Sequence, residues 1–445
     1  MHYVIIGGDA AGMSAAMEIV RNDKDAQITT LEKGTIYSYG QCGLPYVVNG
    51  WIESTDKVIA RSVEAFRAKY GIDAKIGYEV TAIDPKSKTV SGIIESENSF
   101  EISYDRLLIA TGAAPIIPDW DGVNLEGIHT IKTIPNTEAI MADLVHAHNI
   151  TIIGAGYIGL EMAESFHSLG KNVRIIQRGH QVAKIFDRDM AEIIHEEAKK
   201  QHIELILDES VQAFTGDKRV QTIETNKGNY QTDLVLIAAG VKPSTAFIEK
   251  AGIQTASNGA IIVNSCMETN VKDIYAAGDC ATHFNRVKQQ NDYIPLGTTA
   301  NKQGRIAGLN MAGYETIFKG IVGTSVMKFF DLTLARTGIS EKEVEKLGIP
   351  YDKHVQQATD IAGYYPGKEK MNLKLIYRKD NQLLLGAQII GGKGVDKRID
   401  VLATALFHEM SLGDLLDLDL AYAPPFNGVW DPIQQVAKRA FKKNV

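Results

Sequence analysis

The 445-residue chain is too long for a single hydrophobic core, so its length predicts two or three domains. Its composition, 44% hydrophobic and 23% charged with a net charge of −7, offers no basic excess for nucleic acid. No apolar run approaches the roughly 18 residues that a membrane span needs. Three cysteines argue against a disulfide scaffold, and the chain begins directly with a strand pattern. We therefore expect a cytoplasmic protein without a signal peptide.

A dinucleotide-binding βαβ pattern opens the chain. Residues 2–6 are typical of a buried strand, GGDAAG follows at 7–12, and a helical run leads to a second strand that ends at Glu32. The glycines allow a tight turn and a close approach of pyrophosphate to a helix N-terminus, and an acid at the end of the second strand accepts from a ribose hydroxyl. Asp9 replaces the middle glycine, which weakens the motif taken alone. The strand before it and Glu32 after it support the prediction.

A second βαβ pattern begins at residues 150–153, where GAGYIG at 154–159 matches the glycine motif completely. Before it, a buried strand ends at Thr111 and Gly112, and residues 234–243 repeat that pattern as the closing strand of the second unit. Two such units predict either two bound dinucleotides or a duplicated domain with one site lost.

The remaining chain predicts two different structures. Residues 260–279 are typical of a strand, a polar turn and a strand that ends at Gly278 and Asp279. After Gly320, residues 325–340 and 373–391 predict antiparallel strands, with a turn at Asp380 and Asn381, and helical patterns follow. The fold class is therefore α/β, with two Rossmann-like domains and a C-terminal α+β module suited to an interface.

Cys42 stands between Gly40 and Gly43, just before Pro45. Positions 37 and 47 hold no cysteine, so a Cys-x4-Cys pair is excluded. Proline suits the first turn of a helix, which predicts that Cys42 lies at a helix N-terminus, where a thiolate is favoured. A buried, inert cysteine is the commoner case, but the surrounding glycines and tyrosines are poor core material. We therefore expect a reactive thiol beside a redox cofactor.

The order of these motifs resembles the flavoprotein disulfide reductases with two dinucleotide-binding folds, along the whole chain. The resemblance implies an FAD-binding domain at 1–112 and 244–320, an NAD(P)H-binding domain at 113–243 and a dimerisation domain at 321–445, in a homodimer with shared active sites. The implied FAD contacts are Gly7, Ala10, Ala11, Gly12, Glu32, Lys33, Val80, Thr111, Gly112, Asp279, Leu296, Gly297 and Thr298. The implied NAD(P)H contacts are Gly154, Gly156, Tyr157, Ile158, Gly159, Gln177, Arg178 and Gly240.

The lone cysteine in the pattern S-x-x-x-C-x-L-P-Y at 38–46 is similar to coenzyme A–disulfide reductases. The segments at 363–367 and 422–426 resemble the paired tyrosines that this family extends into the other subunit's thiol site. The resemblance thus implies catalytic roles for Cys42, Tyr364 and Tyr422, and no metal. We expect NAD(P)H to reduce coenzyme A disulfide through FAD and a Cys42–coenzyme A mixed disulfide. The implied substrate contacts are Ser14, Glu18, Arg21, Ser38, Gln41, Arg61, Arg67, Lys69 and Asn301.

Three alternatives remain open. A persulfide or polysulfide reductase needs the same thiol and a less discriminating pocket. Related NADH peroxidases and oxidases carry a histidine in the first glycine loop, where this chain has Ala10. An electron-transfer reductase for a ferredoxin-like partner would leave Cys42 as a structural residue, and alkylation of Cys42 would then spare its activity.

The second glycine unit also predicts the nicotinamide cofactor. Aligning LEKG at 31–34 with IQRG at 176–179 puts Gln177 in the place of Glu32, with Arg178 beside it. Gln177 carries no charge to repel a 2′-phosphate, and Arg178 can meet that phosphate. We expect both NADPH and NADH to work, with NADPH equal or better.

Overall fold

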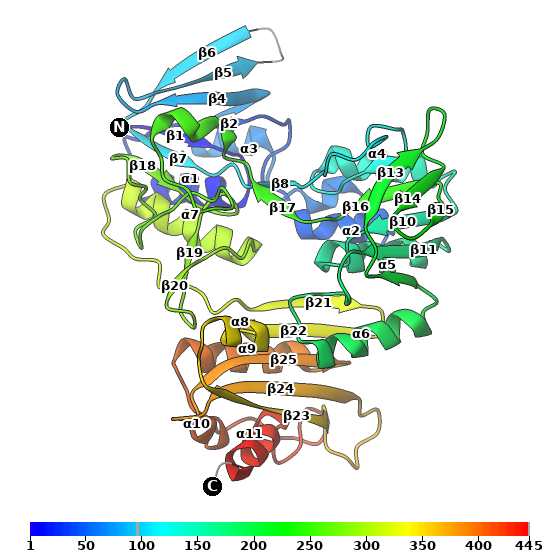
Figure 1. Ribbon diagram of the computed structural model, residues 1–445. Helices are drawn as coiled ribbons and strands as arrows, with labels where there is room; N and C mark the ends of the chain where they lie inside the picture. The colour runs from blue at the N-terminus through cyan, green and yellow to red at the C-terminus, as the bar shows by residue number, and fades with distance from the viewer. Residues whose placement is uncertain (95–97, 444–445) are drawn as a thin grey trace.

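The computed structural model describes residues 1–94 and 98–443, which form two nucleotide-type domains side by side above an antiparallel domain (Figure 1). This arrangement confirms the predicted α/β class. No described helix has both the length and the apolar character needed to cross a bilayer.

The first domain is built on a five-stranded parallel sheet. The strands at 2–6, 106–109 and 274–276 are mostly apolar, as expected when other layers cover both faces of a sheet, whereas those at 27–32 and 73–76 carry several polar residues. All strands point the same way, so their carboxyl ends meet at one edge, where ligands bind in open α/β sheets. In sheet order the strands are β18 (Ile274–Ala276), β7 (Arg106–Ile109), β1 (His2–Ile6), β2 (Gln27–Glu32) and β3 (Asp73–Ile76).

Two helices of this domain pack against each other unusually closely. A Cβ added at Gly304 would lie 2.2 Å from the Ala11 carbonyl oxygen, and one at Gly308 would lie 2.5 Å from that of Ala15. Glycine at these positions therefore lets the helix axes approach. The two helices are α1 (Ala10–Asn22) and α7 (Gly297–Met311). The domain also contains α3 (Val63–Tyr70), which packs against β3, and an antiparallel sheet of β4 (Tyr78–Asp84), β5 (Thr89–Ile94) and β6 (Asn98–Ser103).

The second domain repeats the plan with another five-stranded parallel sheet and a separate antiparallel sheet of three strands. The parallel strands are β12 (Glu204–Leu207), β11 (Asn172–Gln177), β10 (Asn149–Ile153), β16 (Leu234–Ile237) and β9 (Ile128–His129). Its other elements are α4 (Ile134–Leu144), α5 (Tyr157–Ser168), α6 (Arg188–Lys200), β13 (Val211–Thr215), β14 (Thr222–Thr225) and β15 (Asn229–Gln231).

The chain passes between the two domains along a short antiparallel pair, β8 (Ala113–Pro115) with β17 (Val241–Pro243), seen between the domains in Figure 1. The strand β18 returns to the first sheet after the second domain is complete. These observations support our proposal that the domain boundaries fall at residues 112–113 and 243–244.

The C-terminal domain is a five-stranded antiparallel sheet with helices packed on it. The strands predicted at 325–340 and 373–391 are confirmed, whereas the edge strand β23 was not predicted. The domain contains β21 (Ser325–Phe329), β22 (Leu332–Gly338), β23 (Tyr351–Thr359), β24 (Lys370–Arg378), β25 (Leu384–Gly391), α8 (Glu341–Lys346), α9 (Val395–Phe407), α10 (Leu412–Leu416) and α11 (Pro432–Lys443).

One strand prediction is wrong. Residues 260–263 make only isolated bridges, in which Ile261 pairs with Thr255 and with Ala281. Ile261 is fully buried in the first core although it has no continuous strand partner. The apolar residues there are therefore explained by burial in the core and not by a place in the sheet.

A buried ionic junction joins the first domain to the C-terminal domain. Lys288, in the hairpin β19 (His283–Asn285)–β20 (Gln290–Asp292), lies 2.9 Å from Asp292 and 2.7 Å from Glu343 of α8. Glu343 also meets Arg336 at 3.2 Å. Burial alone would raise the pKa of Glu343, but Arg336 and Lys288 outweigh it and lower the pKa to about 2.

We expect this junction to stabilise the fold at neutral pH and to weaken in acid. A carboxyl with a lowered folded-state pKa adds stability above its unfolded value of about 4.5, and that stability is lost as the pH falls towards 2. Glu343→Gln should cost about 2 kcal/mol at pH 7 and progressively less between pH 4.5 and 2, as measured by urea unfolding. The exposed Glu53→Gln is the matched control, and an equal change in both variants at pH 7 would contradict the assignment.

Candidate functional site

Cys42 lies in a single 3₁₀ turn, Gln41–Gly43, which leads directly into the short helix α2 (Leu44–Val48) with Pro45 in its first turn. Leu44 and Val48 are buried in the hydrophobic core of the second domain, not in that of the first. The helix therefore bridges the two nucleotide domains. Cys42 itself is exposed, and none of the three cysteines forms a disulfide.

Backbone contacts hold the turn on two sides. The Ser38 N–H donates to the Gly8 carbonyl at 2.9 Å, on the side of the first glycine loop. On the other side, the Gly40 N–H donates to the Val58 carbonyl at 2.8 Å, and the Ala60 N–H donates to the Ser38 carbonyl at 2.8 Å. Ser38 has a φ of +49°, a conformation costly for a residue other than glycine, which the surrounding bonds hold in place.

The chain raises the pKa of the Cys42 thiol, through desolvation first and then through the carboxylate of Glu161, while Lys132 opposes them. The lowered pKa predicted from a helix N-terminus is therefore wrong for the chain alone. The physical reason is that α2 has only five residues and a buried acid lies near the sulfur. Because the chain alone raises this pKa, any lowering of it must come from groups that bind at the site.

Two charged residues near the thiol were not predicted from the sequence. Burial and Glu164 raise the pKa of Glu161 to about 7. Lys132 lies 3.7 Å from Asp279 and acts on both Cys42 and Asp9. Neither belongs to a local motif: Glu161 looks like an ordinary helix residue, and Lys132 lies 90 residues from Cys42. No sequence signal could have placed them at the thiol.

The first glycine loop has the geometry of a phosphate cradle. Gly7 has a φ of +115°, and a Cβ there would lie 2.2 Å from the Ala110 carbonyl oxygen. Glu32 accepts the Gly8 N–H at 2.9 Å and the Gly34 N–H at 2.7 Å, so the acid at the strand end braces the loop. Near the same edge, Gly112 and Gly297 face open space where a side chain would stand. These residues fit the close approach of a dinucleotide.

The other residues expected at FAD lie around this edge. Thr111 follows β7 and donates through its hydroxyl to the Ser244 carbonyl at 2.8 Å. Asp279 follows β18, and Val80 is buried in β4. The remaining expected contacts lie in the first turn of α1, just after β2 and at the start of α7: Ala10, Ala11, Gly12, Lys33, Leu296 and Thr298.

The second glycine loop reproduces the first. Gly154 has a φ of +103°, and a Cβ at Gly159 would lie 2.0 Å from the Gly154 carbonyl oxygen. Gln177 accepts the Ala155 N–H at 3.1 Å, as Glu32 does in the first loop, which supports their alignment. The expected residues Gly156, Tyr157, Ile158, Arg178 and Gly240 lie around the carboxyl ends of β10, β11 and β16.

The residues expected at the substrate fall into two surface groups. The Ser14 hydroxyl on α1 donates to the Asn301 side chain on α7 at 2.8 Å. One turn further on, Glu18 pairs with Arg21 at 2.8 Å and lies 4.0 Å from Arg305. Sequence reasoning missed Arg305. This group forms one continuous polar surface across α1 and α7.

The second group surrounds α3. Arg61 and Lys69 lie 5.3 and 5.4 Å from the Tyr70 ring, so an aromatic face stands between two cations. Arg67 is the least available of the expected cations, because its guanidinium donates twice to the Ala74 carbonyl at 2.9 and 2.6 Å.

Tyr364 and Tyr422 come together although 58 positions separate them, with their hydroxyls 3.0 Å apart. They are 74% and 45% exposed, which is high for aromatic side chains. They belong to the C-terminal domain, where β23 and α11 lie at the end of the molecule remote from the first domain (Figure 1). Within one chain the antiparallel sheet separates that end from α2.

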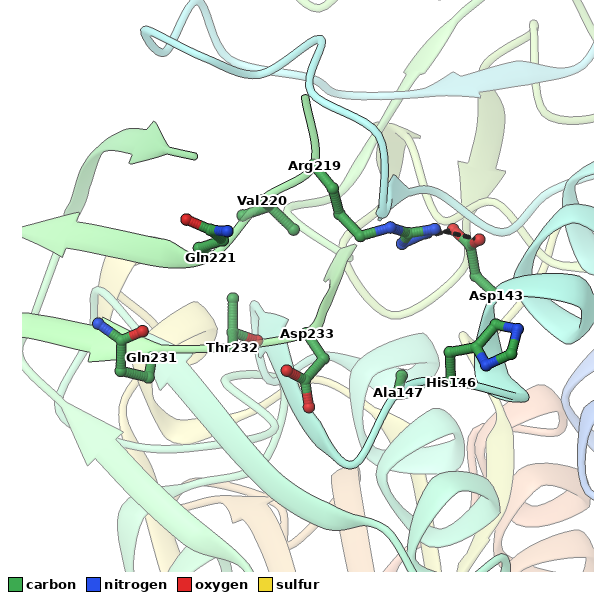
Figure 2. A pocket seen from close by; sticks show the side chains of 9 residues that line it. All are labelled: Asp143, His146, Ala147, Arg219, Val220, Gln221, Gln231, Thr232 and Asp233. Atoms are coloured by element: carbon green, nitrogen blue, oxygen red, sulfur yellow. Dashed lines mark hydrogen bonds and ion pairs between the residues drawn. The ribbon is translucent and has the colours of Figure 1, made fainter. Parts of the chain in front are cut away.

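The described chain also has a cavity of about 410 Å³ in the second domain, whose lining includes none of the expected site residues. Figure 2 shows the Arg219 guanidinium directed to the Asp143 carboxylate. His129 binds the same carboxylate at 2.7 Å, so Asp143 is already paired. We assign no chemistry to this cavity.

Comparison with known proteins places the chain in a family. The model described as pyridine nucleotide-disulphide oxidoreductase matches residues 1–304, and the model of its dimerisation domain matches residues 324–432. The NAD(P)H coenzyme A polysulfide/persulfide reductase of Pyrococcus horikoshii is 38% identical over 98% of this chain and 97% of its own length. The NADH oxidase of Methanocaldococcus jannaschii is 33% identical over 100% and 99%.

Two further comparisons agree. The coenzyme A disulfide reductase of Staphylococcus haemolyticus is 33% identical over 98% of both chains. The crystal structure of reduced Bacillus anthracis CoADR-RHD superposes with a TM-score of 0.97 at 34% identity, covering 100% of this chain and 80% of that one. The chain therefore belongs to the pyridine nucleotide-disulphide oxidoreductases, flavoproteins that use FAD and NAD(P)H.

Proposed function

We propose that the protein reduces coenzyme A disulfide to two thiols at the expense of NAD(P)H, in the cytoplasm and as a homodimer. The single exposed thiol at the seam of the two nucleotide domains carries this proposal. Cys280 is fully buried against the Ile109 and Ala277 carbonyls, so it is not available to resolve a Cys42 disulfide. The substrate itself must then supply the second sulfur, which coenzyme A does.

The reaction follows from thiol–disulfide exchange. The Cys42 thiolate attacks one sulfur of coenzyme A disulfide, forms a mixed disulfide and releases one coenzyme A thiolate, which takes up a proton. FAD supplies, when bound, the two electrons from NAD(P)H that cleave the mixed disulfide. The Tyr364–Tyr422 pair of the partner subunit is the proposed proton donor to the leaving thiolate. Both tyrosines lie within residues 324–432, which match the dimerisation domain, and this supports a role for them in the site of a second copy.

The anionic end of coenzyme A needs cations outside the thiol pocket. Arg21 on α1 and the pair Arg61 and Lys69 around Tyr70 are the proposed phosphate contacts. The Ser14–Asn301 contact lines the proposed path of the pantetheine arm, with Ser38 at its inner end.

A persulfide or polysulfide reductase is the second candidate, because the relative from Pyrococcus horikoshii carries that name. It needs the same thiol. The ratio of the turnover numbers with coenzyme A disulfide and with coenzyme A persulfide, measured at equal concentration, distinguishes the two activities.

The first test removes the thiol. We expect Cys42→Ser to reduce coenzyme A disulfide turnover to background, because Cys42 is the exposed thiol, whereas Cys266 is only partly exposed and Cys280 is buried. FAD content and bleaching of the flavin by NAD(P)H should stay normal. Mass spectrometry of the untreated wild type should find coenzyme A attached at Cys42. Cys266→Ser is the matched control and should turn over as wild type, and disulfide turnover retained in Cys42→Ser would contradict the mechanism.

The second test concerns the shared site. We expect Tyr364→Phe and Tyr422→Phe each to slow the disulfide half-reaction by about a hundredfold, the lower end of the effect of losing a general acid. Flavin reduction by NAD(P)H, followed by stopped flow, should not change. Tyr365→Phe is the adjacent control. In mixed dimers of a Cys42→Ser chain with a Tyr422→Phe chain, one complete site should remain, and total loss of activity there would rule out sharing.

The third test concerns the nicotinamide cofactor. Gln177→Glu should raise the KM for NADPH by about tenfold and spare NADH, because a carboxylate would face the 2′-phosphate. Arg178→Ala should also raise the KM for NADPH alone. Steady-state kinetics with both cofactors measures this. A wild type that uses NADH tens of times better than NADPH would show that Arg178 does not reach the phosphate.

A further inference from the structure

Asp9 occupies the middle position of the first glycine loop, and its side chain reaches the turn that carries the thiol. The Gln41 side-chain amide donates to the Asp9 carboxylate at 2.6 Å. The Tyr39 N–H also interacts with that carboxylate. Gln41 immediately precedes Cys42. Asp9 therefore binds the turn Gln41–Gly43, which we call the thiol turn, next to the reacting sulfur.

The two glycine loops allow an internal comparison. Gly156 holds the equivalent position in the second loop, and a Cβ there would meet no atom within 4 Å. Asp9 has φ −116° and ψ −155°, close to the φ −80° and ψ −168° of Gly156, so the backbone does not require glycine at either position. The loops share one conformation and differ in what their middle residue contacts. Only the first loop has a thiol turn beside it.

The surroundings make the Asp9–Gln41 bond a strong one. Burial raises the pKa of Asp9, whereas the hydrogen bonds from Gln41 and Tyr39 lower it. Of the nearby charges, Glu32 raises this pKa and Lys132 lowers it. An amide bound to a partly buried carboxylate is held more tightly than one bound to a neutral oxygen. The bond ties the side chain of Gln41 to the first glycine loop, at the residue immediately before Cys42.

We propose that Asp9 is a positioning residue for the thiol: through Gln41 it holds the Gln41–Gly43 turn against the first glycine loop and orients Cys42 for disulfide exchange. The proposal rests on the proposed function, because the exchange step is what the orientation serves. It changes the role of Gln41, whose amide is engaged with Asp9 rather than free for the pantetheine arm. Asp9, which weakens the match to the nucleotide-binding motif, thereby has a separate role in positioning the thiol.

The test is a double-mutant cycle with Asp9→Ala, Gln41→Leu and the double variant, made as holoenzymes. Gln41→Leu breaks the same bond from outside the glycine loop, so it serves if Asp9→Ala loses FAD. Hydrogen–deuterium exchange followed by mass spectrometry should show faster exchange of residues 38–43 in each variant, by about tenfold for a charge-assisted bond. A peptide from α5 should exchange as in the wild type.

The kinetic expectation is equally specific. Each single variant should slow the disulfide half-reaction by about tenfold, and the double variant by no more than either, because both remove one bond. Flavin reduction by NAD(P)H should be unchanged, which a merely structural defect would not predict. Asp9→Asn should recover most of the exchange protection, since its carbonyl can still accept from Gln41.

Additive effects in the cycle, unchanged exchange of residues 38–43, or an Asp9→Asn variant that behaves like Asp9→Ala would each overturn the proposal. The exchange experiment uses no disulfide. If the wild type fails to reduce coenzyme A disulfide, the proposed function fails while the exchange cycle still decides whether Asp9 holds the thiol turn.

Discussion

The segment that carries the thiol, residues 38–43, is flanked by residues buried in two different hydrophobic cores, and the rest of the site depends on this constraint. Tyr37 is buried in the first core, where its hydroxyl donates to the Lys75 carbonyl at 2.8 Å. Leu44 and Val48 are buried in the second. The six residues between these anchors, 38–43, have little freedom left. Because close-packed cores resist deformation, the sulfur is placed by the domain arrangement rather than by a flexible loop.

The two nucleotide domains show how one scaffold is adapted to two tasks. Each loop is braced by the residue at the end of its second strand, Glu32 in the first and Gln177 in the second. The change from acid to amide removes a negative charge from the second loop. The change from Gly156 to Asp9 adds one to the first and uses it to hold the thiol turn. The two loops thus share one backbone conformation and differ in the side chains at these two positions.

The charges around the sulfur give the site a second property. Glu161, Lys132 and Asp279 act on the Cys42 thiol, and Lys132 also lies 3.7 Å from Asp279 and acts on Asp9. Burial and Glu161 raise the pKa of the thiol while Lys132 opposes them, so the chain by itself favours the protonated form. Lys132 and Cys42 are far apart in the sequence, so this arrangement of charges arises only in the folded chain.

The sequence by itself determined the architecture and the chemical type of the site. Apolar strands followed by glycine turns at 7–12 and 154–159 depend on local backbone geometry, so they were predictable, as were the antiparallel C-terminal strands and the place of Cys42 just before a short helix. Strand β23 and the small sheets were missed because their side chains alternate weakly or sit on edges. Tertiary structure alone decided which charges surround the sulfur. Glu161, Lys132 and Asp279 act on it from separate elements, and no local pattern encodes such a meeting, because electrostatic partners are set by packing.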